Sequence, residues 1–413
     1  MLLRTAKRVA IWRCIAQCMP NCVPSIAFLR SLACSVERQV AATYKGLWTK
    51  VKKNAEARKA GLTKKRYKGL DKPPKYVSPT VQYTYERDYT FKSEQHVSLT
   101  TLEGRLTLSY QGYHPHVALI QHGACIGDAK IWYDQSQKQF YLLVSLEIER
   151  DDPTFESHKE VIGVDVGVRY LAVTSTSLGQ TSFHTGKRVR HQANHYARLR
   201  KRLQRKGTRW AKRRLQRIAQ RERRFKQQAN HVISKYIVKT HPQALIGLEQ
   251  LSDIRERTKR RKRRRKKNGK GTEPVSPKAR KSNRVYSQWS FAELQGMIAY
   301  KAVLSSSMAI KVDANSTSKS CPKCGYTSDT NRPQKGLLFH CQNCHYELHA
   351  DLVGARNITM RTLLLRQDWG KTGLLSVASD ASDKEAKAAR LQRYAELRWS
   401  SDASPSRSTG RGD

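Results

Sequence analysis

Two Cys-x-x-Cys pairs constrain the fold of this chain more than any other feature of its sequence. They lie in the stretch CPKCGYTSDTNRPQKGLLFHCQNC at 321–344, with sixteen residues between the pairs. Four thiolates can enclose one Zn²⁺ ion tetrahedrally, and a four-sulfur shell leaves no open position for catalysis. A structural zinc site is therefore predicted, with four ligands: Cys321, Cys324, Cys341 and Cys344.

Two alternatives to this ligand set exist. His340, His345 and His349 lie close to the second pair, and one of them could replace a cysteine. The four thiols could also share this spacing by coincidence. The regular spacing favours four cysteine ligands, and Gly325 directly after the first pair favours the tight turn that such a site needs.

The charge balance indicates the partner. The chain has 413 residues with 79 Lys and Arg against 33 Asp and Glu, a formal net charge of +46. Such an excess repels itself unless a polyanion neutralises it, so nucleic acid is expected over ribosomal, membrane-surface or antimicrobial roles. The sequence offers no amphipathic anchor or long apolar segment, and its nine cysteines are an odd number. We expect a cytoplasmic, nucleoid-associated protein without a membrane partner.

The basic residues concentrate in a helical region at about 190–240. Eighteen Lys or Arg and one acidic residue, Glu222, lie within 187–226, too great an excess for intrahelical ion pairs. Gly207 predicts a turn between two helices, and Trp210 and Tyr196 could stack on bases or pack between helices. The candidate nucleic-acid contacts are Arg198, Arg202, Arg205, Arg209, Lys212, Arg213 and Arg217.

Apolar periodicity outlines the remaining segments. The pattern is helical from about Ser25 to Lys59, whereas 77–150 alternates apolar and polar residues in short runs that predict strands. The Gly/Pro-interrupted segment at 255–284 contains nine consecutive basic residues and is expected to be flexible when free. The last forty-odd residues are expected to form a loosely ordered tail.

Three acidic residues stand where a carboxylate needs an explanation. Asp165 interrupts the apolar run VIGVDVG, Glu249 ends ALIGLE, and Asp351 begins a helix in ADLVGARNI. Singly, they could be a turn residue, an exposed strand end and a helix N-cap. Together they fit phosphodiester hydrolysis, in which hard oxygen ligands hold two Mg²⁺ ions. We predict that they form one catalytic magnesium site.

These motifs together resemble those of TnpB, a family of transposon-encoded RNA-guided nucleases long known as OrfB transposases and related to compact type V CRISPR effectors. The stretches GVDVGVRYLAVTS, IGLEQLSDI and CPKCGYTS…CQNCHYELHADLVGARNI have the order and spacing of the three split nuclease motifs and the zinc ribbon of that family. SQWSFAELQGMIAYKA resembles the helix that precedes the ribbon. The resemblance covers about 25–366.

The resemblance implies an α+β multidomain chain. A split RuvC, RNase H-like α/β nuclease domain would carry an inserted zinc ribbon and follow an N-terminal β-barrel wedge domain with a helical recognition insertion. Asp165, Glu249 and Asp351 would be its metal-binding triad, and its partners would be a guide RNA from the same locus and double-stranded target DNA. The implied divisions are an atypical N-terminus at 1–24, a recognition segment at 25–60, the wedge at 61–155, the nuclease domain at 156–312, the ribbon at 313–348, the final nuclease helix at 349–366 and a flexible tail at 367–413.

Two departures from the family pattern carry expectations of their own. The family usually opens with a strand of the wedge barrel, which residues 1–24 do not resemble; if that strand is missing, an unpaired barrel edge is expected. Val353 stands where the family often has Asn, two positions after the last Asp. We predict a magnesium-dependent RNA-guided DNA endonuclease; the alternatives are a nuclease-silent RNA-guided repressor, a DNA-joining transposase and a nonspecific zinc-ribbon packager of nucleic acid.

Overall fold

The structure is a computed structural model whose contacts divide the chain into two compact units, Met1–Asp151 and Asp152–Asp413. Its helices and strands form a mixed α/β protein. Among the described residues, no helix is both long and apolar enough to cross a bilayer. The described residues are 8–11, 26–59, 61, 63–76, 80–92, 95–101, 103–134, 138–151, 153–158, 160–251, 263–265, 272–277, 279, 283, 290–333, 337–375 and 384–399.

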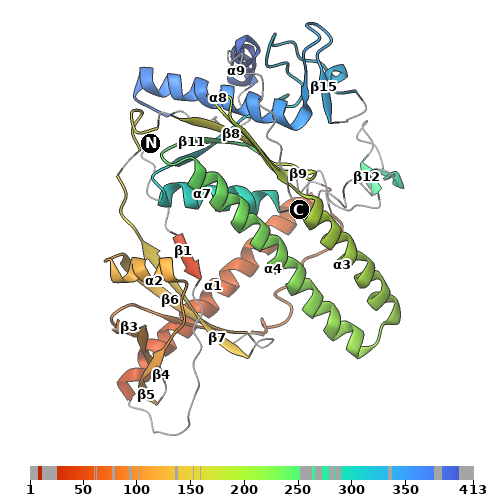
Figure 1. The fold of residues 1–413 in the computed structure, drawn as a ribbon. Helices are drawn as coiled ribbons and strands as arrows, with labels where there is room; N and C mark the ends of the chain where they lie inside the picture. Colours follow the sequence, from red (N-terminus) through yellow and green to blue (C-terminus); the bar gives the residue numbers. More distant parts are fainter. Residues whose placement is uncertain are drawn as a thin grey trace. The chain divides into compact units, whose positions relative to one another are not determined.

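The first unit combines one long helix with two antiparallel sheets (Figure 1). The helix predicted from about Ser25 is present as α1 (Ile26–Lys59), and its Gln39 side chain donates a 2.8 Å hydrogen bond to Thr80 of β2. One sheet has the order β1-β7-β6-β2, the other β3-β4-β5. The strands and the short helix of this unit are β1 (Arg8–Ile11), β2 (Thr80–Tyr83), β3 (Tyr89–Lys92), β4 (His96–Thr101), β5 (Gly104–Ser109), α2 (His114–Gln121), β6 (Cys125–Asp134) and β7 (Gln139–Glu147).

The two sheets share one apolar core, which is what the alternating pattern of 77–150 predicts. Tyr83, Val97 and Val144 are among its buried members. The expectation of an unpaired edge is wrong at β7, because Arg8–Ile11 pairs with this strand in antiparallel register, Arg8 opposite Leu146. The other residues of 1–24 lie outside the described part of the chain. Closure of the two sheets into a wedge barrel stays a prediction.

The second unit is organised around a five-stranded sheet with the order β10-β9-β8-β11-β14. The three strands β8, β11 and β14 run parallel, and β9 and β10 extend the sheet with antiparallel pairs. Parallel strands need crossover helices, and the intervening chain supplies them. The strands are β8 (Val161–Asp165), β9 (Tyr170–Thr176), β10 (Thr181–Thr185), β11 (Leu245–Glu249) and β14 (Met308–Val312).

Helices cover both faces of this sheet (Figure 1). Side chains alternate between faces along a strand, so Val164 and Leu248 belong to the core that includes residues of α4 (Arg209–Thr240) and α7 (Phe291–Leu304). Gly163 and Gly247, which pair across β8 and β11, face α8 (Ala350–Thr372). A Cβ at Gly163 would collide with the α8 backbone, so α8 can lie directly on these strands only because both positions are glycine.

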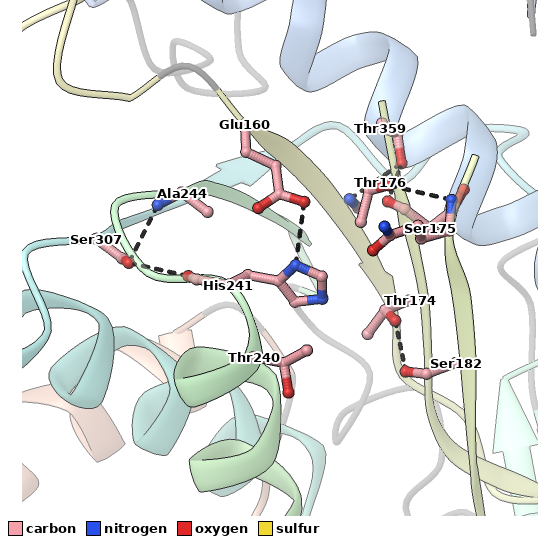
Figure 2. A network of polar contacts seen from close by, with 12 residues as sticks. Glu160, Thr174, Ser175, Thr176, Ser182, Thr240, His241, Ala244, Ser307 and Thr359 are labelled. Carbon is pink, nitrogen blue, oxygen red and sulfur yellow. Dashed lines mark hydrogen bonds and ion pairs between the residues drawn. The ribbon is translucent and has the colours of Figure 1, made fainter. Parts of the chain in front are cut away.

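The amino ends of the three parallel strands are tied together by side chains (Figure 2). His241 precedes β11, and its Nδ1 lies 3.1 Å from Glu160 Oε1 at the start of β8. The Ser307 hydroxyl donates to the His241 carbonyl at 3.3 Å and accepts from the Ala244 N–H at 3.2 Å. These contacts fix the strand entries at the edge of the sheet opposite to Asp165 and Glu249.

Two basic helices form an antiparallel hairpin, as the sequence predicts. α3 (Lys187–Lys206) ends at Gly207, whose positive φ of 68° terminates the helix, and Thr208 caps the start of α4. Glu222 is buried and pairs with Arg200 of α3 and Lys226 of α4. Burial alone would raise the pKa of Glu222, but hydrogen bonds and charges from Lys226 and Arg200 outweigh it and lower the pKa.

The prediction of a loosely ordered tail from residue 367 is wrong for its described part. α8 continues to Thr372, and a further helix, α9 (Lys384–Glu396), packs beside it (Figure 1). Arg393 of α9 makes two hydrogen bonds, of 2.8 and 2.9 Å, to the Asp368 carboxylate. The composition of the tail does not predict these contacts, because they depend on Arg and Tyr side chains rather than on an apolar stripe.

Much of the basic segment at 255–284 lies outside the described residues, as do 376–383 and 400–413. Within it, β12 (Arg263–Arg265) pairs with β13 (Thr272–Pro274) in an antiparallel ladder. The expected flexibility and RNA contact of the remaining residues there stay predictions.

Candidate functional site

The four cysteines converge on one point. Their sulfur atoms lie within 4.8 Å of one another, with 3.6 Å between Cys321 and Cys344 and 3.5 Å between Cys324 and Cys341. Sulfurs bound to one tetrahedral zinc at about 2.3 Å would be about 3.8 Å apart, so the cluster fits Zn²⁺. Among the described residues, no other group of three or more His, Cys, Asp or Glu side chains gathers its ligand atoms this closely.

Each cysteine pair is part of a tight knuckle turn with the same hydrogen bonds. The Gly325 N–H donates to the Cys321 carbonyl at 2.8 Å, and the His345 N–H donates to the Cys341 carbonyl at 3.0 Å. Both turning residues have positive φ, 76° at Gly325 and 54° at His345. His345 therefore serves as a turn residue, and the alternative in which a histidine replaces a cysteine is not needed.

A fully buried asparagine joins the two knuckles. Asn331 donates to the carbonyls of Lys319 at 2.9 Å and Tyr326 at 3.1 Å, and its oxygen accepts the Gln342 N–H at 3.0 Å. The module ends in the ladder β15 (Leu338–His340) and β16 (Glu347–His349), and β16 continues without a break into α8. The cysteine module thus fixes where α8 begins.

The three predicted carboxylates lie at one edge of the sheet of the second unit. Asp165 ends β8 and Glu249 ends the adjacent parallel strand β11, so both project from the carboxyl edge toward α8. Asp351 lies in the first turn of α8. A Cβ at Gly354, one turn further along α8, would lie 3.2 Å from the Asp165 carboxylate, which shows how closely this helix approaches β8.

Two of the three acidic residues do not have the simpler role that each could have had alone. Glu249 is buried with 8% of its surface exposed, so it is not an exposed strand end. The N-cap of α8 is His349, whose Nδ1 accepts the Asp351 N–H at 3.3 Å, so Asp351 is not the cap. Its carboxylate remains free to face Arg332, whose guanidinium lies 3.3 Å away.

Like charges concentrate at this edge. The pKa of Asp165 is raised well above its usual value by burial and by the nearby carboxylates of Glu249 and Asp351, against a smaller lowering by Arg332. Burial also raises the pKa of Glu249, although the hydrogen bond from Thr317 opposes this. A buried carboxylate whose pKa is raised by two neighbouring carboxylates marks a place that a cation would stabilise.

A divalent metal fits these residues. The donors are carboxylate oxygens, which Mg²⁺ prefers, and three of them suffice because Mg²⁺ keeps several waters of its own. Three residues that the sequence does not mark contact the acidic residues: Arg332 pairs with the Asp351 carboxylate, Thr317 donates to the Glu249 carboxylate, and Gln295 donates to the Glu249 backbone carbonyl. They come from loops and a helix remote in sequence, and no local pattern marks them.

The basic hairpin presents the predicted nucleic-acid residues to solvent. All seven predicted contacts are exposed on α3, α4 or the turn between them. Trp210 has 58% of its surface exposed and stacks with the Arg214 guanidinium at 5.2 Å, whereas Tyr196 packs inside the hairpin. Of the two aromatic residues, Trp210 is therefore the one available for stacking on a base.

Two family models match separate parts of the chain. The model described as "Probable transposase" (OrfB_IS605) matches residues 143–253, which contain Asp165, Glu249 and the basic hairpin. The model described as "Cas12f1-like, TNB domain" matches residues 291–358, which contain the cysteines and Asp351.

Two curated relatives and one solved structure extend the comparison. The CRISPR-associated endodeoxyribonuclease Cas12f1 of Sulfoacidibacillus thermotolerans is 26% identical over 251 residues, 57% of this chain and 53% of that protein. The putative RNA-guided DNA endonuclease InsQ of Escherichia coli (strain K12) is 28% identical over 231 residues, 54% of each chain. The chain spans about half the length of these relatives. A cryo-EM structure of a Cas12f1–sgRNA–target DNA complex has a TM-score of 0.37, at 16% identity over 69% of this chain and 67% of that chain.

Proposed function

Because the matches confirm the resemblance to TnpB-like proteins and compact type V effectors, we propose that this chain is an RNA-guided DNA endonuclease of a transposable element. The observation that carries the proposal is the meeting of Asp165, Glu249 and Asp351 at one edge of the sheet. The second unit would be a split RuvC-type nuclease domain with an inserted zinc ribbon. The first unit would be the wedge barrel, with α1 as its recognition helix.

Asp165, Glu249 and Asp351 would hold the catalytic magnesium. When bound, Mg²⁺ supplies an activated water and neutralises charge on the scissile phosphate. The chain itself supplies the ligands, which the two parallel strands and α8 hold in place. Arg332 lies 3.3 Å from Asp351 and adds a positive charge beside them. The four cysteines would hold Zn²⁺, which fixes the start of α8 and takes no part in the chemistry.

The exposed face of α3 and α4 would contact phosphates of a guide RNA or its heteroduplex with double-stranded target DNA. Contacts from Lys and Arg to phosphates attract any nucleic-acid backbone and carry no sequence information. In an RNA-guided enzyme the base pairing between guide and target supplies that specificity. Guide–target pairing would therefore supply the sequence specificity that the hairpin does not provide.

The decisive experiment separates cutting from binding. The protein is expressed together with its native flanking locus, purified and washed at high salt. The RNA that it retains is then sequenced to identify the guide. Cleavage of matched DNA is then compared between wild type and Asp165→Ala with Mg²⁺. We expect Asp165→Ala to abolish cleavage and to retain the RNA. Cleavage by the variant would overturn the triad, and joined DNA ends in the wild-type reaction would indicate a transposase.

A further inference from the structure

The Glu249 carboxylate accepts a hydrogen bond from a residue that belongs to none of the sequence motifs. The Thr317 hydroxyl donates a 2.5 Å hydrogen bond to Glu249 Oε1, and 3% of Thr317 is exposed. The hydroxyl has one hydrogen, and its other neighbour, the Ala314 carbonyl, lies further away at 3.3 Å. Since a carboxylate oxygen is the stronger acceptor, the hydrogen belongs to the Glu249 contact.

The backbone of Glu249 is held as well. Gln295 of α7 donates a 2.8 Å hydrogen bond from Nε2 to the Glu249 carbonyl, and both residues are buried. The end of β11 is therefore fixed at its main chain from one face of the sheet and at its side chain by Thr317. A buried Glu held at both points has little freedom to rotate.

The turn that carries Thr317 is fastened to α8. Asn357 donates to the Thr317 carbonyl at 2.6 Å and to the Ser320 carbonyl at 2.9 Å. One turn further along, Arg361 donates to the Asn315 carbonyl at 2.7 Å and to the Asp313 carbonyl at 2.5 Å. The helix that presents Asp351 thus also holds the donor that orients Glu249, so the two carboxylates share one support.

We propose that Thr317 is a positioning residue that occupies Oε1 of Glu249 and leaves Oε2 as the oxygen that binds the divalent metal. This inference rests on the proposed nuclease function. The hydroxyl donor uses one of the lone pairs of Oε1 and fixes the plane of the carboxylate, which favours Oε2 as the oxygen that meets a metal. The arrangement predicts monodentate binding by Glu249, in an orientation set by Thr317 before the metal arrives.

The test measures metal binding apart from cleavage. Mn²⁺ is titrated into zinc-loaded protein without nucleic acid, and free Mn²⁺ is followed by electron paramagnetic resonance in wild type, T317V, T317S, T317A and D165N. T317V and T317A remove the donor, and we expect each to weaken Mn²⁺ binding about tenfold or more. T317S keeps the hydroxyl and should stay close to wild type.

Thr174→Val is the matched control. Thr174 is also buried and its hydroxyl bonds to Ser182 at 2.6 Å, but it does not touch Glu249, so its loss should lower stability and leave Mn²⁺ affinity unchanged. With guide RNA present, T317V should raise the Mg²⁺ concentration needed for half-maximal cleavage. Wild-type Mn²⁺ affinity in T317V, with binding lost in D165N, would overturn the inference alone. Equal binding by wild type and D165N would overturn the proposed metal site and this inference with it.

Discussion

The backbone N–H of Trp399 donates a 2.8 Å hydrogen bond to the carbonyl of Pro322, which lies between the first two cysteines of the zinc site. The Trp399 ring also stacks on the Arg356 guanidinium of α8 at 4.9 Å, and the Tyr394 ring on that of Arg361 at 4.3 Å. The segment 384–399 therefore contacts the first knuckle and α8 at once. It fastens the zinc module to the helix that carries Asp351.

The double variant Trp399→Ala and Tyr394→Ala should weaken this attachment. Removing an aromatic ring from a partly buried guanidinium costs about 0.5–2 kcal/mol, so we expect a lower melting temperature and several-fold slower cleavage. Thermal unfolding and cleavage of guide-matched DNA measure the two effects. Gln392→Ala, an exposed position on α9, is the control and should change neither. Unchanged cleavage in the double variant would show that the attachment does not support the site.

Loss of zinc should inactivate the protein although zinc takes no part in the chemistry. Cys344→Ser removes one of four thiolates, so the bound zinc measured by elemental analysis should fall and cleavage should be lost. The reason is that β16 leads directly into α8, so without the knuckles the first turn of α8, which carries Asp351, loses the segment that anchors it. Cys125→Ser, at an exposed free cysteine of the first unit, should keep zinc and activity. A zinc-free variant that still cleaves would contradict this role.

The carboxylate cluster should lower the free energy of unfolding when no divalent metal is bound. The pKa of Asp165 is raised in the folded state by burial and by Glu249 and Asp351. Below the pKa of the unfolded chain, about 3.9, both states are protonated and the penalty is absent. Between that pH and the raised folded pKa the unfolded chain has lost this proton and the folded chain has kept it, so stability falls as pH rises, and the full penalty is reached above the folded pKa.

Asp165→Asn removes that penalty. In magnesium-free buffer above the folded pKa, we expect Asp165→Asn to unfold at a higher denaturant concentration than wild type. Added Mg²⁺ should narrow the gap, because it stabilises the ionised cluster of the wild type. Glu396→Gln, at an exposed site on α9, is the control and should not respond to Mg²⁺. A variant that is no more stable than wild type would show that the cluster carries no such strain.

The sequence predicts the parts of the site that depend on local pattern. The cysteine spacing is set by the knuckle turns, and the two apolar runs that end in Asp165 and Glu249 each predict a strand. Neither pattern reveals that Gly163 pairs with Gly247, which is what lets α8 lie on the strands. Thr317 and Arg332 reach the carboxylates only through tertiary contacts between remote segments. Their positions follow from the packing of α8 and could not be predicted beforehand.

The basic hairpin offers a test in which charge and structure give different outcomes. Arg202, Arg209 and Lys212 are exposed, whereas Arg200 pairs with the buried Glu222. Each phosphate that is no longer neutralised should reduce the slope of log affinity against log salt by about 0.7–0.9. In the variant with all three residues changed to alanine, this slope should therefore fall by about two or more, and RNA binding at low salt should be weaker. Arg200→Ala should instead lower the melting temperature, because it leaves Glu222 buried with one partner fewer. Fluorescence anisotropy of labelled guide RNA across a salt series measures the slopes. A triple variant with the wild-type slope would place the nucleic-acid contacts elsewhere on the protein.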